Sequence, residues 1–167
     1  MKTKLYSILA FGALILAPLG QIRADDAVSK SDKELFKNAG EMNMTEIALG
    51  RMAQEKAFSP EVKSLGATLV ADHSGMNTDL IALAKKKGVD MTLEPTVTEK
   101  TMLEAFKAKS GVEFDREFRE HVAKDHDKAI KTLTDAVEDS KDPDVKAFAA
   151  KNLASFQAHM QMIGGKQ

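Results

Sequence analysis

Residues 59–88 read SPEVKSLGATLVADHSGMNTDLIALAKKKG, and this stretch decides the fold class. Ser59 followed by Pro60 is a typical helix start, and the lysine run 85–87 followed by Gly88 is a typical helix end. Between these signals, apolar residues recur at intervals of three and four residues. The stretch therefore predicts one long amphipathic helix from about Pro60 to Lys87.

Helices of the same kind are expected on both sides of this stretch. The periodicity predicts long helices at about 32–57, 113–140 and 143–163, and a short one at about 98–109. Residues 142–146 (DPDVK) repeat the pattern of residues 59–63 (SPEVK), so each segment begins the second helix of a hairpin. We predict an all-α domain over residues 32–163: a four-helix bundle of two hairpins, joined by a crossover with a short extra helix. This wiring is found in ferritin-like bundles.

The first 24 residues have the features of an export signal. Lys2 and Lys4 precede an apolar run at 5–17, which is 13 residues long and too short to span a bilayer comfortably as a helix. We expect cleavage after Ala24, a flexible lead-in at 25–31 and a short tail at 164–167. An uncleaved membrane anchor is the alternative. The predicted location is periplasmic or secreted, with no integral membrane span after cleavage.

Composition excludes several classes of function. The chain has no cysteine, which rules out disulfides, thiolate metal sites and cysteine nucleophiles. Removing residues 1–24 takes away three basic residues and no acidic one, which moves the formal net charge from −1 to −4. A mildly acidic chain without a basic patch is not expected to bind nucleic acid. No serine or threonine lies in a recognisable nucleophile motif, so an enzyme is not favoured. The sequence identifies no protein partner.

Four ionisable residues interrupt the apolar faces of the long helices. Glu46 lies 14 residues before Pro60 and His73 lies 13 after it, so both lie roughly 20 Å from the first turn. His126 lies 17 residues before Pro143 and His159 lies 16 after it, roughly 25 Å from the second turn. His73 and His126 are each 14 residues from the nearer end of the connection, at Lys87 and Val112. The four side chains are therefore expected in one layer of the bundle.

Two interpretations of this layer stay open. In the first, the residues form a structural network of hydrogen bonds and ion pairs that fixes helix register. In the second, Glu46, His73, His126 and His159 bind a divalent metal ion such as zinc, iron, manganese or copper. Asp72 and Asp125 adjoin two of the histidines and lie about 100° round the helix, so they are predicted to orient an imidazole of a neighbouring helix.

Copper is a separate hypothesis, because thioether and imidazole together suit Cu(I). His73 and Met76, and likewise His159 and Met162, are spaced i, i+3. Further methionines lie on the expected helices at positions 42, 44 and 160. Methionine at helical spacing is more often a core residue than a ligand.

Several segments also resemble one known family. These are residues 46–51 (EIALGR), 59–63 (SPEVK), Asp72-His73, Phe114-Asp115, His126 and His159. Together they are similar to the exported family numbered 4142 among domains of unknown function, over nearly all of 32–163. The resemblance implies a ferritin-like bundle and export, but no established activity.

The chain departs from di-iron ferritins in one respect. Di-iron bundles carry Glu-x-x-His on two helices, whereas Val70, Ala123 and Phe156 precede the three histidines by three residues here. Ferroxidase chemistry is therefore not expected. The sequence predicts an exported, non-catalytic bundle with an envelope or stress role, and as the alternative a metal-binding or metal-dependent redox protein.

Overall fold

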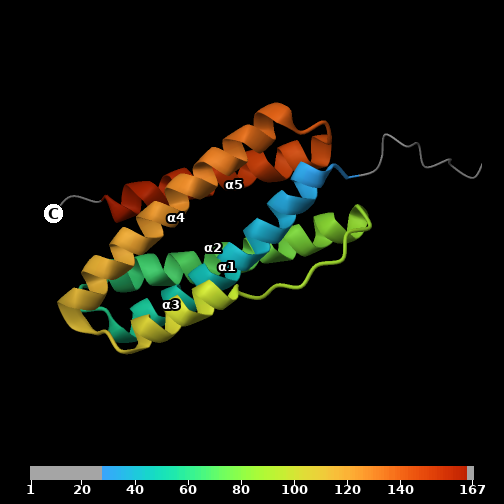
Figure 1. The fold of residues 1–167 in the computed structure, drawn as a ribbon. Coiled ribbons are helices and arrows are strands. Elements are labelled where there is room, and N and C mark those ends of the chain that lie inside the picture. The colour runs from blue at the N-terminus through green and yellow to red at the C-terminus, as the bar shows by residue number, and fades with distance from the viewer. Residues whose placement is uncertain (1–27, 165–167) are drawn as a thin grey trace, which may run out of the picture.

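The structure is a computed structural model that describes residues 28–164. The predicted export signal, its cleavage site and the last three residues lie outside this range. The described chain forms five helices: α1 (Lys30–Lys56), α2 (Pro60–Lys86), α3 (Val97–Lys107), α4 (Gly111–Asp139) and α5 (Pro143–Ile163) (Figure 1). The prediction of an all-α fold with four long helices and one short helix is confirmed.

The two hairpins, α1–α2 and α4–α5, are joined by a connection that returns along the bundle with α3 (Figure 1). At one end, an isolated backbone bridge links Ala57 to Gly111, so α4 begins beside the α1–α2 turn. At the other end, Lys87 Nζ lies 2.6 Å from Asp142 and 2.7 Å from Asp144, so α2 ends where α5 begins. Consequently α4 runs parallel to α2, as the predicted crossover requires. The ferritin-like classification itself stays a prediction.

Residues at the α1–α2 turn hold the start of α4 in place. The Asp115 carboxylate accepts hydrogen bonds from the backbone N–H groups of Phe58, at 2.9 Å, and Ser59, at 2.8 Å. The Ser59 hydroxyl in turn accepts from the backbone N–H of Val62 and caps α2. One buried carboxylate therefore satisfies two backbone donors that lie before the first turn of α2.

The first helix begins earlier than the sequence predicts. Ser29 caps α1 by accepting a hydrogen bond from the Asp32 backbone N–H at 3.0 Å, so α1 begins at Lys30 and not at about residue 32. Positions 29, 31 and 32 all carry cap-forming residue types, and only the backbone conformation selects among them. The helix therefore includes the last two residues of the expected lead-in.

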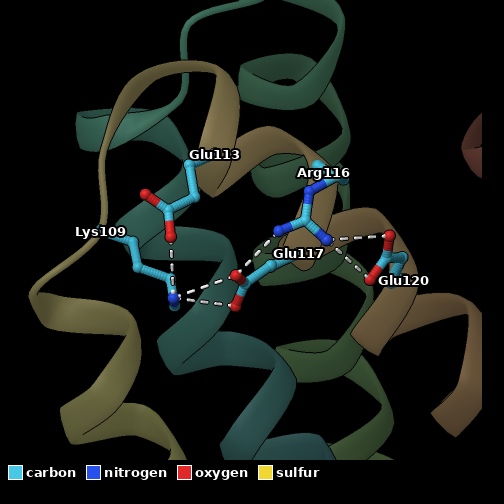
Figure 2. Close-up of polar contacts among 5 residues, drawn as sticks. All are labelled: Lys109, Glu113, Arg116, Glu117 and Glu120. Atoms are coloured by element: carbon cyan, nitrogen blue, oxygen red, sulfur yellow. Dashed lines mark hydrogen bonds and ion pairs between the residues drawn. The ribbon is translucent and has the colours of Figure 1, made fainter.

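The outer face of α4 near its start carries a ladder of alternating charges (Figure 2). Lys109 Nζ contacts Glu113 at 3.2 Å and Glu117 at 3.0 Å, and Arg116 contacts Glu117 and Glu120. Most of these side chains are exposed, so each pair contributes little stability. The ladder keeps the surface of the α3–α4 corner polar.

The hydrophobic core is divided into two clusters. One includes Phe36, Leu80 and Val145, and the other includes Leu49, Leu69 and Phe118. The residues of each helix change from one cluster to the other near positions 46, 73, 126 and 159. Buried polar residues therefore interrupt the core at the level that the helix lengths predict. None of the described helices has both the length and the apolar character needed to cross a bilayer.

Two glycines allow α1 and α2 to touch through their backbones. A Cβ atom added at Gly66 would lie 2.7 Å from both the Cβ of Ala53 and the carbonyl oxygen of Gly50. A Cβ added at Gly50 would lie 2.6 Å from the carbonyl oxygen of Gly66. Because these neighbours are backbone or a methyl group on a packed helix, neither can rotate away. The two helices must separate to accept a larger residue.

Replacing Gly66 with alanine is expected to destabilise the protein by about 1–3 kcal/mol, the usual cost of overpacking. The matched control is Gly75→Ala in the same helix, where a Cβ meets no atom within 4 Å. That control should raise stability by up to about 1 kcal/mol, because alanine restricts the unfolded chain and favours helix. Urea unfolding measures both changes. Equal effects of the two substitutions would contradict the close contact.

Candidate functional site: a buried histidine layer

The structure brings Glu46, His73, His126 and His159 together, one from each long helix. Glu46, His73 and His126 are 0% exposed and His159 is 1% exposed. The ring centroids of the three imidazoles lie 5.2–5.7 Å apart. Full burial of four ionisable groups is costly unless they bind one another or an ion.

A chain of contacts runs from the surface into the layer. At its outer end is Asp72, with a side chain that is 45% exposed. The Oδ2 atom of Asp72 lies 2.8 Å from His159 Nε2. His159 Nδ1 lies 3.1 Å from His126 Nε2. His126 Nδ1 then faces Glu46 Oε1 at 3.9 Å, which is too long for a hydrogen bond. Asp72 therefore orients the imidazole of another helix, as its position beside His73 predicted.

His73 is held by two asparagines that sequence reasoning did not single out. Its Nδ1 lies 2.8 Å from Asn43 Oδ1, and Asn43 Nδ2 donates to Asn77 Oδ1 at 2.8 Å. Since the amide oxygen of Asn43 is only an acceptor, His73 Nδ1 carries the proton. His73 Nε2 is then a bare lone pair. It is buried, and no described group donates to it.

Three further polar atoms of the layer also lack hydrogen-bond partners among the described residues. Both carboxyl oxygens of Glu46 and Nδ1 of His126 are buried without a hydrogen bond in the described structure. An unpartnered buried polar atom costs about 1–3 kcal/mol. A network whose only role is to fix helix register should satisfy its members. This layer leaves four atoms unsatisfied, counting His73 Nε2.

Asp125, predicted to orient an imidazole of the layer, has other partners. Its carboxylate lies 3.2 Å from His121 Nε2 and 3.1 Å from Lys128 Nζ. Both partners are on α4, four and three residues away. Burial raises the pKa of Asp125, but the hydrogen bonds and charges of His121 and Lys128 outweigh burial and hold that pKa at about 2. Asp125 therefore acts on the layer only as a nearby negative charge.

An apolar wall and the methionines complete the surroundings. The Phe156 ring lies 5.3 Å from His73, 4.7 Å from His126 and 6.1 Å from His159 between centroids. Met76 is a buried member of the apolar core, and Met162 is 39% exposed. Met44 Sδ accepts a hydrogen bond from Asn77 at 3.4 Å. Met44 therefore contacts Asn77 beside the layer, whereas Met162 lies largely at the surface.

Burial determines the protonation of the layer. It raises the pKa of Glu46 well above the usual range, and the charge of Asp125 raises it further. Burial also lowers the pKa of His73 well below the usual range, with contributions from His126 and His159. Burial and then the nearby His159 lower the pKa of His126 to about 4. Burial therefore disfavours the charged forms of Glu46, His73 and His126 alike.

The metal-free protein is expected to lose stability between pH 7 and pH 4.5. His73 and His126 have folded pKa values below their unfolded values near 6.5, so their contribution is present above pH 6.5 and lost on acidification. Glu46 acts in the opposite direction and offsets part of this loss. Urea unfolding at the two pH values tests this. Constant or higher stability at pH 4.5 would contradict the buried neutral imidazoles.

One nitrogen of each of the three imidazoles lies within 4.8 Å of the others. Glu46 is outside this group. It faces Nδ1 of His126, whereas His159 faces Nε2 on the other side of the same ring. The structure thus separates the predicted set into three convergent histidines and a carboxyl group behind one of them.

Comparison with known proteins places the chain in a family. A family model described as "Domain of unknown function (DUF4142)" matches residues 17–164. The chain belongs to the DUF4142 family. Searches of curated proteins and of solved structures each found no match. The resemblance noted in the sequence is therefore confirmed for this DUF4142 protein, and its chemistry must be argued from its own residues.

Proposed function

We propose that this DUF4142 protein binds one divalent transition-metal ion through His73, His126 and His159. The observation that carries the proposal is the convergence of three buried imidazole nitrogens within 4.8 Å of one another. The hydrogen bonds select the atoms: His73 Nε2, His126 Nε2 and His159 Nδ1. Three imidazoles are a known zinc ligand set, and imidazole also suits copper, iron and nickel.

The partners of the opposite ring nitrogens support this assignment. Metal-binding histidines almost always donate their second N–H to a carboxylate, a carbonyl or water. Here His159 Nε2 contacts Asp72 and His73 Nδ1 contacts Asn43, each at 2.8 Å. Glu46 stands in the corresponding place behind His126 Nδ1, at 3.9 Å. Two of the three histidines therefore have a hydrogen-bonded acceptor behind them, and the third faces a carboxyl group.

The spacing of two ligand nitrogens also fits a metal. Tetrahedral coordination with metal–nitrogen distances near 2.0–2.1 Å puts two ligand nitrogens about 3.3 Å apart. His126 Nε2 and His159 Nδ1 lie 3.1 Å apart. Without metal, one of the two nitrogens donates its proton to the other. With metal, that proton belongs on His126 Nδ1, where an ionised Glu46 would accept it.

The proposal is tested by titrating metal-free protein with Co²⁺, whose visible absorption reports tetrahedral nitrogen coordination. One ion per chain and a rise in melting temperature on binding are expected, because a ligand that binds only the folded state stabilises it. A layer that serves only helix register gives neither the absorption nor the thermal shift. That outcome would overturn the proposal.

We also propose that the protein is exported and acts in the cell envelope. Its support is the sequence of residues 1–24: Lys2 and Lys4, the apolar run 5–17 and the small residue Ala24. Mass spectrometry of protein recovered from a periplasmic fraction should show a mature chain that begins at Asp25. Full-length chain confined to the cytoplasm would contradict export.

A further inference from the structure

Two cavities adjoin one another along the seam between α1 and α4. The first has a volume of about 320 Å³ and reaches Asn43 and Phe156 beside the histidine layer. The second, of about 310 Å³, lies nearer the start of α1 and the end of α4. Leu35, Asn38 and Thr132 line both, so the cavities form one groove along the seam. It extends from residue 31 to residue 43 of α1, or about 18 Å.

The floor of this groove is apolar and its sides are acidic. Leu35, Ala39 and Leu133 are among the apolar residues of the floor. The carboxylates belong to positions 32, 34, 41, 99, 125, 135 and 139, against a single base among the lining residues, Lys128. Those at 41, 125 and 135 have basic partners, and the other four have none among the described residues. A cleft lined by one sign of charge concentrates ligands of the opposite sign.

Two buried side chains in the groove have acceptor atoms without a donor. Asn152 is 3% exposed, and its Nδ2 donates to the Phe148 carbonyl at 2.8 Å. Its Oδ1 receives no hydrogen bond from a described residue, and it lines the first cavity. Asp32 is 4% exposed and lines the second cavity, and no described residue bonds to its carboxylate. The groove therefore offers hydrogen-bond acceptors at both ends, which suits a ligand with donors at both ends.

We propose that this groove binds a linear aliphatic polyamine. Its methylene segments would cover the apolar floor, and its ammonium groups would meet Asn152 and the acidic side chains. An ammonium group has only donors, which matches a site that has mainly acceptors. The site is distinct from the metal layer, although Asn43 and Phe156 contribute to both.

The test is calorimetric titration of metal-free protein with spermine at about 0.15 M salt, where long-range attraction between exposed charges is largely screened. Thr132→Lys puts a cation at the junction of the two cavities. Its matched control is Thr78→Lys, because each hydroxyl bonds the carbonyl four residues earlier at 3.1 Å and both threonines are exposed. The two variants carry the same net charge.

Wild type and Thr78→Lys are expected to bind one spermine per chain, and Thr132→Lys at least ten-fold more weakly. Absence of binding to wild type, or equal binding by all three proteins, would overturn the proposal, since equal binding means general charge attraction. Co²⁺ titration of Thr132→Lys should match wild type. The spermine titration therefore tests the groove proposal, and the Co²⁺ titration tests the metal proposal independently.

Discussion

Replacing His73 with asparagine is expected to lower the affinity for Co²⁺ by more than about 100-fold, because loss of a direct ligand exceeds the 10–100-fold loss typical of outer partners. The asparagine amide keeps a donor for Asn43 where His73 Nδ1 lies, and it removes the unpartnered Nε2. The substitution therefore removes the proposed ligand atom and keeps the hydrogen bond to Asn43. Competition titration against a chelator of known affinity measures the loss.

The matched control for this experiment is His121→Asn. His121 is on α4 outside the layer, and it pairs with Asp125 at 3.2 Å. This variant should bind Co²⁺ with wild-type affinity. Circular dichroism of both variants checks that the bundle remains folded. A His73→Asn protein within three-fold of wild-type affinity would show that His73 is not a ligand.

Replacing Glu46 with glutamine is expected to change stability and metal affinity in opposite directions. The folded pKa of Glu46 is raised, so its contribution to stability is present below about pH 4.5 and is lost as the pH rises. Glutamine does not titrate. The metal-free variant should therefore match wild type near pH 4.5 and be more stable than wild type at pH 7. Urea unfolding at both pH values measures the difference.

The same substitution should weaken Co²⁺ binding by about ten-fold or more, because an ionised Glu46 no longer accepts the proton of His126 Nδ1. A residue kept at a cost to stability and needed for binding is typical of a functional site. If Glu46→Gln were less stable than wild type at pH 7 and bound metal normally, Glu46 would be a structural residue. The assignment of its role behind His126 would then be wrong.

Much of the fold could be predicted because the sequence has strong signals for helix starts and ends. Ser59-Pro60 and Asp142-Pro143 fix two helix starts. Because each residue of a helix adds a constant rise, the number of residues from a start gives a side chain's height along the bundle. The convergence of His73, His126 and His159 follows from those counts. The N-cap of the first helix could not be predicted from the sequence. Ser29, Ser31 and Asp32 are all capping residue types, and the choice depends on the backbone.

The surroundings of the histidines were less predictable. Asn43 lies three residues before Glu46, and Asn77 lies four after His73, so both could have been recognised as polar residues one turn from the layer. Their bond to each other depends on the rotation of α1 against α2, two helices that are in close contact at Gly50 and Gly66. For Asp125, the sequence predicted a role that the structure does not show. Its sequence position suggests an outer partner, yet a histidine and a lysine on its own helix bind it instead.

The central claim is that three imidazoles bind one metal ion in the buried layer. X-ray absorption spectroscopy of zinc-loaded protein, with the zinc content measured on the same sample, tests it most directly. We expect one zinc per chain with three imidazole nitrogens at about 2.0–2.1 Å. Zinc bound only by oxygen ligands, or less than about one ion per ten chains after loading, would contradict it.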